Sequence, residues 1–155
     1  MATEVEPIII AKYFLKKSLE DGSLITNLQM QKLVYFAYAE HLRKKNGSRL
    51  FKEKLEAWPN GPVSPSLYKA LSSYGRGPID EKFVGQKDLK LIESVSGSVK
   101  DFLDSIYDEY MKYTAFELVA LTHEEKAWQK AREGLEPHES SKNPLEDRYI
   151  LQDGK

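Results

Sequence analysis

The stretch TNLQMQKLVYFAYAEHLRKKNG, residues 26–47, has the clearest helical pattern in the chain. Thr26 and Gln29 are typical of a capping box, which satisfies free backbone N–H groups at a helix start, and Gly47 is a stop signal. Apolar residues recur at spacings of three and four: Leu33, Val34, Ala37, Tyr38 and Leu42. Polar residues fall largely elsewhere on the helix: Gln31, Lys32 and Glu40. We therefore expect a helix of about five turns with one buried face.

Other start and stop signals predict five further helices. They are expected to begin near residues 7, 65, 98, 114 and 122, where a proline or a Ser/Thr cap precedes apolar periodicity. The apolar residues of 49–58 are interrupted by charges, which suits a small β-hairpin. The expected fold is mainly α, a compact single-domain bundle of about six short-to-medium helices with a small hairpin near residues 49–58.

Length and composition limit the class of protein. A chain of 155 residues with 41% hydrophobic and 30% charged residues fits one soluble globular domain. The net charge of -1 argues against nucleic acid as a partner, and the basic residues 43–45 are also typical of a helix end. The absence of cysteine excludes disulfides and thiolate chemistry. Since no signal peptide or membrane span is recognisable, we expect a cytoplasmic protein with no membrane partner.

The sequence contains no recognisable catalytic motif. HEEKA at His123 lacks the second histidine of a zinc-protease helix, because residue 127 is alanine. The phosphate-binding loop, the dinucleotide fingerprint and the nucleophile elbow are also absent. We therefore expect no enzyme activity, no cofactor and no metal. The alternative is an enzyme whose residues converge only in three dimensions, which a polar pocket containing His41 or His123 with carboxylates would favour.

Three segments of the chain follow one another in a distinctive order. They are ITNLQMQKLVYFAYAEHL, LFKEKLEAWPNGPVSPSLYKALSSYGRGPI and LVALTHEEKAWQKAR. Their motif residues are Gln31, Lys32, Leu33, Tyr35, Phe36, Ala57, Trp58, Gly61, Pro62, Val63, Tyr74, Gly75, Leu121, Thr122, His123, Glu125 and Trp128. Together they resemble the Panacea domain family of bacterial and phage antitoxins. The resemblance covers roughly residues 8–133 and leaves residues 134–155 as a polar C-terminal extension, which we expect to dock on the same domain.

The resemblance implies a mainly α-helical antitoxin that neutralises a cognate protein toxin by direct binding and without catalysis. It also implies that the toxin is encoded by an adjacent gene. Some relatives act instead as adaptors that deliver a toxin to a protease, and this alternative stays open here.

Candidate partner-binding residues lie at the proline-rich corner and in the last motif: Trp58, Asn60, Tyr68, Arg76, His123 and Trp128. Two roles fit each tryptophan, an exposed interface anchor or a plug of the core beneath the corner. Two also fit His123, a neutral hydrogen-bonding group at a helix start or a pH-sensitive partner contact. The remaining candidates form the expected structural signature: Gly61, Pro62, Pro65, Gly75 and Thr122.

Overall fold

The computed structural model describes residues 5–85, 90, 93 and 97–153. Within these residues the helices are α1 (Pro7–Asp21), α2 (Asn27–Lys44), α3 (Pro65–Leu71), η1 (Ser72–Tyr74), η2 (Glu81–Phe83), α5 (Gly97–Tyr110), α6 (Ala115–His123), α7 (Lys126–Ala131) and α8 (Asp147–Asp153). The strands are β1 (Glu56–Trp58) and β2 (Gly61–Val63). The mainly α fold class with a small β-hairpin is confirmed.

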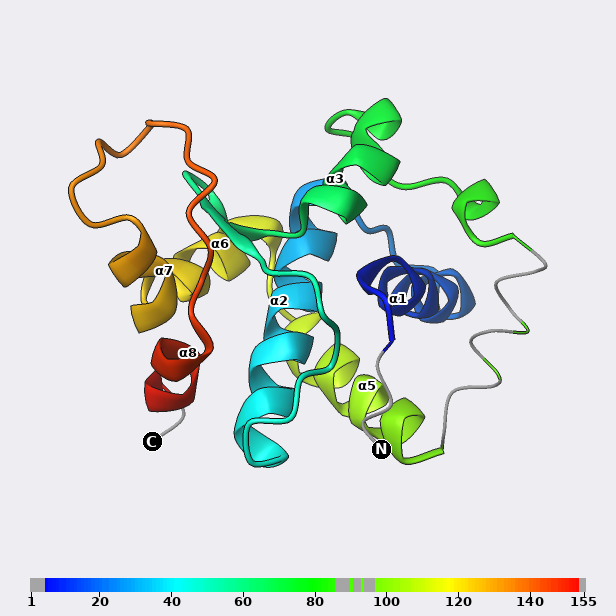
Figure 1. Ribbon diagram of the computed structural model, residues 1–155. Helices are drawn as coiled ribbons and strands as arrows, with labels where there is room; N and C mark the ends of the chain where they lie inside the picture. The colour runs from blue at the N-terminus through cyan, green and yellow to red at the C-terminus, as the bar shows by residue number, and fades with distance from the viewer. Residues whose placement is uncertain (1–4, 86–89, 91–92, 94–96, 154–155) are drawn as a thin grey trace.

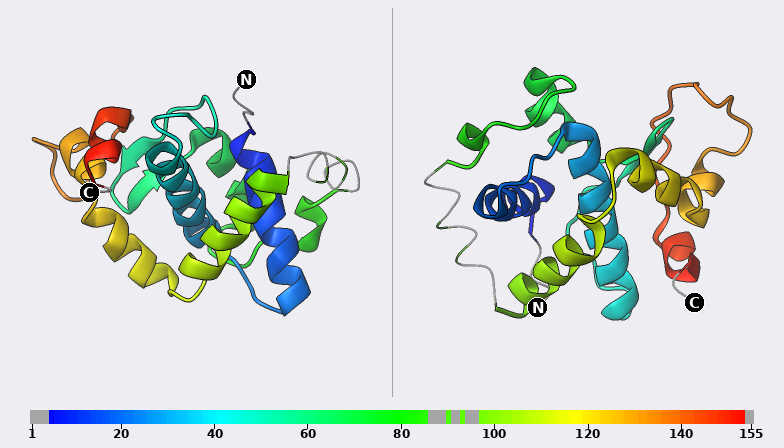
Figure 2. Two further views of the ribbon diagram at one scale, coloured as in Figure 1. Left: turned by 90° about the horizontal axis from the view of Figure 1, so that it is seen from below. Right: turned by 180° about the vertical axis from the view of Figure 1, so that it is seen from behind.

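Helix α2 lies in the middle of the molecule (Figures 1 and 2). Helices α1 and α5 lie on one side of it, and the β-hairpin, α7 and α8 lie on the other. Every residue from 30 to 39 is buried, including Gln31 and Lys32, which are 3% and 0% exposed. The expectation of one buried face with these two side chains outside it is therefore wrong. These two polar side chains are tolerated because each one reaches a backbone partner at or next to β2.

Side-chain caps set the starts of α2, α3 and α6. The side-chain oxygen of Thr26 accepts from the backbone N–H of Gln29, and Ser64 accepts from that of Leu67. Thr114 and Glu117 form a complete capping box at the start of α6. These caps satisfy backbone donors that have no partner inside a first helical turn.

The capping box expected at Thr122 and Glu125 is wrong. Thr122 lies inside α6, and its hydroxyl donates to the carbonyl of Val119 at 2.7 Å. Glu125 precedes α7 but makes no side-chain cap. The carboxylate of Asp153 takes that place, because it accepts from the backbone N–H of Lys126 at 2.6 Å and of Ala127 at 3.4 Å.

The hairpin overlaps the end of the range expected for it. Strands β1 and β2 pair antiparallel, with Trp58 opposite Gly61. On its other side β1 borders the C-terminal segment, because the N–H of Ala57 donates to the carbonyl of Asn143 at 2.9 Å. The N–H of Leu145 donates to the carbonyl of Leu55 at 2.8 Å. Residues 143–145 thus lie along the hairpin and lead into α8.

Tyrosine–carboxylate hydrogen bonds join elements that are distant in sequence. The pairs are Tyr13–Asp104, Tyr35–Glu125, Tyr38–Asp147, Tyr107–Asp21 and Tyr110–Glu40. Burial and the neighbouring carboxylate raise the pKa of each phenol. All five phenols therefore remain donors at neutral pH and tie the helices to one another.

Candidate partner-binding site at the β-hairpin

Side chains from α2 hold the strand β2 and the residue after it. The ammonium of Lys32 donates to the carbonyl of Pro62 at 2.9 Å. The side-chain oxygen of Gln31 accepts from the backbone N–H of Ser64 at 2.9 Å. Both supporting side chains are buried, so these bonds are shielded from water and fix the backbone position of the strand.

Side chains from α6 and α7 hold β1 and the turn. The guanidinium of Arg132 donates to the carbonyl of Ala57 at 2.8 Å, and the indole N–H of Trp128 donates to the carbonyl of Trp58 at 2.8 Å. Nε2 of His123 lies 3.1 Å from the carbonyl oxygen of Pro59. The hairpin therefore rests on side chains from three helices and from the residue that follows α7.

His123 and Trp128 stack on each other behind the turn. Their ring centroids are 4.1 Å apart and their planes differ by 8°. Burial lowers the pKa of His123, although the hydrogen bond to the carbonyl of Pro59 opposes the effect. Since a carbonyl only accepts, Nε2 carries the proton of a neutral ring. His123 lies in the last turn of α6 and not at a helix start as expected, but its expected neutral hydrogen-bonding role fits this geometry.

Gly61 brings the hairpin close to α2 and α6. Its φ is +113°, a value that L side chains rarely adopt. A Cβ at this position would lie 2.5 Å from Oγ1 of Thr122 and 3.0 Å from Cε of Lys32. Both the backbone conformation and the space therefore require glycine.

Lys32 is a buried amine without a counter-ion. Within the described part of the chain, no carboxylate lies at ion-pair distance from its ammonium. Burial lowers the pKa of Lys32 to about 7. The side chain is thus a cation at slightly acidic pH, held beneath the hairpin at a desolvation cost.

An open groove of about 720 Å³ runs between the hairpin, the first turns of α2, and α3 with the residues that follow it. We call it the hairpin groove. Its apolar lining residues are Leu28, Trp58, Pro59, Val63, Tyr68 and Ala115. Lys32 and Arg76 also line it, and none of the described residues in its lining is an aspartate or glutamate. Such a groove fits an apolar partner segment better than a small polar molecule.

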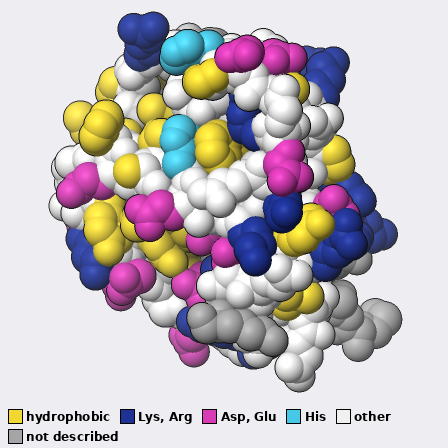
Figure 3. All heavy atoms as spheres, turned by 90° about the vertical axis from the view of Figure 1, so that its left-hand side faces the viewer, with side chains coloured by type: hydrophobic (Ala, Val, Ile, Leu, Met, Phe, Trp, Pro, Cys, Tyr) yellow, Lys and Arg dark blue, Asp and Glu magenta, His cyan; other side chains and the backbone are white. Residues whose placement is uncertain are grey.

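The surface beside α7 and α8 differs from the hairpin groove. Figure 3 shows basic and acidic side chains interspersed over that face, with hydrophobic side chains between them. Such mixing of charges is typical of a solvated surface.

The structure brings four of the six candidate partner-binding residues together. Trp58, Asn60, Tyr68 and Arg76 line the hairpin groove, and the rings of Trp58 and Tyr68 lie 4.8 Å apart. Trp58 is half-buried and Tyr68 and Arg76 are exposed, so the corner is neither wholly core nor wholly surface. His123 and Trp128 are half-buried behind the hairpin and support it.

The residues of the expected structural signature occupy different places. Pro65 begins α3, and Gly75 follows η1 with a φ of +57°. Gly61, Pro62 and Thr122 lie where the hairpin meets α2 and α6. Only these last three contribute directly to the support of the hairpin.

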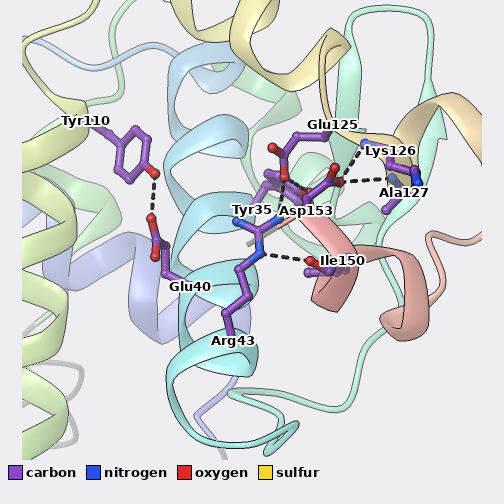
Figure 4. A network of polar contacts seen from close by, with 9 residues as sticks. All are labelled: Tyr35, Glu40, Arg43, Tyr110, Glu125, Lys126, Ala127, Ile150 and Asp153. Atoms are coloured by element: carbon purple, nitrogen blue, oxygen red, sulfur yellow. Dashed lines mark hydrogen bonds and ion pairs between the residues drawn. The ribbon is translucent and has the colours of Figure 1, made fainter. Parts of the chain in front are cut away.

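A second polar network joins α2 to the C-terminal helices (Figure 4). The carboxylate of Glu125 accepts from the guanidinium of Arg43 at 2.7 Å and from the hydroxyl of Tyr35 at 2.6 Å. Arg43 also donates to the carbonyl of Ile150 at 2.8 Å. Although burial opposes it, the pairing with Glu125 raises the pKa of Arg43. The network ties α7 and α8 to α2, and Trp128 of α7 supports the hairpin.

Sequence reasoning missed that Gln31 and Lys32 support the hairpin. Their helical positions placed them on a polar face, whereas the resemblance included both in its first motif. That motif was the available signal, because polar side chains that become buried beside an apolar stripe usually bind backbone groups. It did not reveal their partners, which are backbone atoms 30 and 33 residues away.

His41 and His123, the two histidines that the alternative enzyme hypothesis named, lie apart. His41 contacts the carbonyl of Ser48 and the ring of Phe102, whereas His123 contacts Pro59 and Trp128. Among the described residues, no group of three or more His, Asp or Glu side chains could hold a metal ion. Among the same residues, no helix has the length and the hydrophobicity that crossing a membrane requires.

Fold and groove together define a small, mainly α-helical domain with a rigidly supported hairpin beside an apolar surface groove. The model of the family described as "Antitoxin SocA-like, Panacea domain" matches residues 30–129, and the chain belongs to this family. The protein named "Antitoxin SocA" from Caulobacter vibrioides (strain NA1000 / CB15N) is 28% identical over 124 residues. The alignment covers 77% of this chain and 65% of that relative, so the chain spans just under two thirds of the relative's length. No solved structure matches the chain.

Proposed function

We propose that this chain is a non-catalytic antitoxin that neutralises a cognate protein toxin by direct binding in the hairpin groove. The toxin is the product of an adjacent gene, and both proteins act in the cytoplasm. Family membership supports the antitoxin role.

The observation that carries the proposal is the combination of an exposed apolar groove with a rigid wall. Tyr68 is 42% exposed and Leu28 is 39% exposed, although both are large apolar side chains in a groove. The hairpin that forms the wall is fixed from behind by buried or half-buried side chains, so binding requires little ordering of the antitoxin. Pre-organised apolar surface of this kind favours protein association.

Co-expression with the neighbouring gene product tests the proposal. We expect the neighbour to stop growth when expressed alone, and the pair to grow normally and to copurify as a complex. If the neighbour is harmless alone and does not copurify, the proposal has no basis.

A matched pair of variants tests whether the hairpin groove is the binding surface. Tyr68→Ala should raise the Kd for the toxin at least ~10-fold, because an aromatic anchor is lost. Leu19→Ala, in α1 outside the hairpin groove, is the control, since Leu19 is 43% exposed and Tyr68 is 42% exposed. Equal effects of the two variants, or none, would place the toxin on another face.

The half-life of the toxin separates neutralisation by binding from delivery to a protease. Direct neutralisation predicts that the toxin accumulates in the complex without loss of growth. A toxin that becomes short-lived only when both the antitoxin and a protease are present would identify an adaptor instead.

A further inference from the structure

The hairpin groove combines apolar walls with an uncompensated positive charge. Arg76 is exposed at the groove and makes no hydrogen bond or ion pair with any residue that the structure describes. Lys32 lies beneath the hairpin and, as described above, has no carboxylate partner among the described residues. Neither charge is balanced by an acidic side chain among the described residues that line the groove.

The start of α2 adds to the same potential. Thr26, Asn27 and Leu28 line the hairpin groove, and they are the cap and the first two residues of an 18-residue helix. The N-terminus of a helix carries a partial positive charge, because its first backbone N–H groups have no partner within the helix. Arg76 and the start of α2, together with Lys32 when its amine is protonated, therefore give the apolar groove a positive potential.

We propose that the hairpin groove takes an apolar segment of the toxin that carries an aspartate or glutamate side chain. This inference rests on the proposed function and names the chemistry of the partner. The toxin carboxylate pairs with Arg76 at the groove surface and lies in the field of Lys32 and the first turn of α2. Its apolar neighbours contact Trp58, Tyr68 and Leu28.

Physical chemistry favours this occupant over an apolar segment alone. A planar guanidinium binds a carboxylate with two parallel hydrogen bonds, and such charged pairs are stronger than neutral ones. An uncompensated buried cation is costly in the free protein, and a partner that supplies an anion lowers that cost in the complex. Because the groove is open at the surface, a continuous chain can cross it, and the carboxylate need not come from a chain end.

Arg76→Gln and Lys32→Met test the charge in the complex of the full chain with its toxin. We expect Arg76→Gln to raise the Kd about 10-fold, and Lys32→Met to raise it by a similar or larger factor. The affinity of the unmodified pair should fall with added NaCl more steeply than that of Arg76→Gln, because one charge pair is lost in the variant. Lys45→Gln is the matched control, since Lys45 is an exposed cation at the other end of α2, and it should bind like the unmodified chain.

Toxin variants identify the source of the carboxylate. Each aspartate and glutamate of the toxin is changed in turn to asparagine or glutamine. One position should weaken binding and should be non-additive with Arg76→Gln in a double-mutant cycle. A toxin extended at its C-terminus should bind normally, and loss of binding there would overturn the assignment to a side chain.

Different results contradict the carboxylate proposal and the proposed function. If Tyr68→Ala weakens binding while Arg76→Gln and Lys32→Met bind with unchanged affinity and salt dependence, the groove is used but the carboxylate is not. If the unmodified chain neither neutralises nor binds the toxin, the proposed function itself fails. Arg76→Gln keeps the test decisive if Lys32→Met does not fold, because Arg76 is exposed and makes no hydrogen bond or ion pair with any described residue.

Discussion

Gly61 and Thr122 lie so close together that a Cβ on residue 61 would be 2.5 Å from the hydroxyl oxygen of Thr122. Thr122 cannot move away easily, because it is fully buried and its hydroxyl bonds the carbonyl of Val119. The hairpin can therefore rest against α6 only through a residue without a side chain.

Gly61→Ala is expected to lower the free energy of unfolding by about 2 to 4 kcal/mol, from backbone strain and the steric contact together. Urea denaturation measures the change. Gly134→Ala is the control, because Gly134 has a φ of +83° but nothing within 4 Å of its would-be Cβ. The free energy of unfolding of that variant should decrease by only about 1 kcal/mol. An equal decrease in the free energy of unfolding for the two variants would show that the contact with Thr122 does not contribute to stability.

Glu125→Ala is expected to destabilise the protein by about 2 kcal/mol, because Arg43 and Tyr35 lose a shared acceptor. The value lies below that of a fully buried pair, since the side chains of Arg43 and Glu125 are 14% and 16% exposed. Thermal and urea unfolding both report it. Glu124→Ala removes an exposed carboxylate from the adjacent position and should change the stability by less than about 0.5 kcal/mol. A larger effect at Glu124 than at Glu125 would contradict the network.

Lys32 should make stability rise with pH above neutrality. Its pKa is lowered to about 7 in the folded protein, whereas an unfolded lysine titrates near 10.5. Between these values the unfolded chain binds a proton that the folded protein lacks, so raising the pH favours the folded state. Relative to Lys32→Met, the unmodified protein should gain about 2 kcal/mol between pH ~7 and ~9.

The comparison with Lys32→Met removes the contribution of other groups that titrate in both proteins. His123 is the titratable side chain coupled to Lys32, and its lowered pKa places its own transition below this range. Urea unfolding at several pH values gives the two curves. Parallel curves would mean that Lys32 titrates normally in the folded protein.

Asp153→Ala should destabilise the protein by about 1 kcal/mol, because the first backbone N–H groups of α7 lose their acceptor. Hydrogen exchange at residues 126 and 127 should become faster, which locates the effect. Asp108→Ala, which removes an exposed carboxylate from α5, should leave this exchange unchanged. Unchanged exchange in Asp153→Ala would show that the cap does not protect α7.

Sequence patterns predicted the helix starts that depend on residues close to one another in sequence. The starts of α2, α3 and α6 follow from Thr26, Ser64 and Thr114, since each cap acts on backbone groups within three residues. The same pattern at Thr122 failed, because Glu125 forms stronger charged bonds with Arg43 and because Asp153 replaces it as the cap. The pattern describes a bond between neighbouring residues and gives no information about hydrogen-bonding partners that are distant in sequence.

The candidate site was predictable in part for the same reason. A corner rich in proline and tryptophan marked the hairpin groove, and Trp58, Asn60, Tyr68 and Arg76 do line it. Lys32 was placed on a polar face, because a 3.6-residue period assigns lysine to solvent unless a partner is known. Its partner is the backbone carbonyl of Pro62, and a pattern of side chains carries no information about a backbone acceptor.

The pairing of β1 with residues 143–145 also determines when the hairpin is completed during synthesis on the ribosome. Ala57 bonds Asn143, so the neighbouring segment emerges about 86 residues after the strand that it borders. At roughly 5 to 20 residues per second this interval lasts several seconds. Arg132 and Trp128, which hold the same strand, also emerge late. A nascent chain therefore carries the hairpin sequence long before the last fifth of the chain supplies the segment and the side chains that border and hold the hairpin.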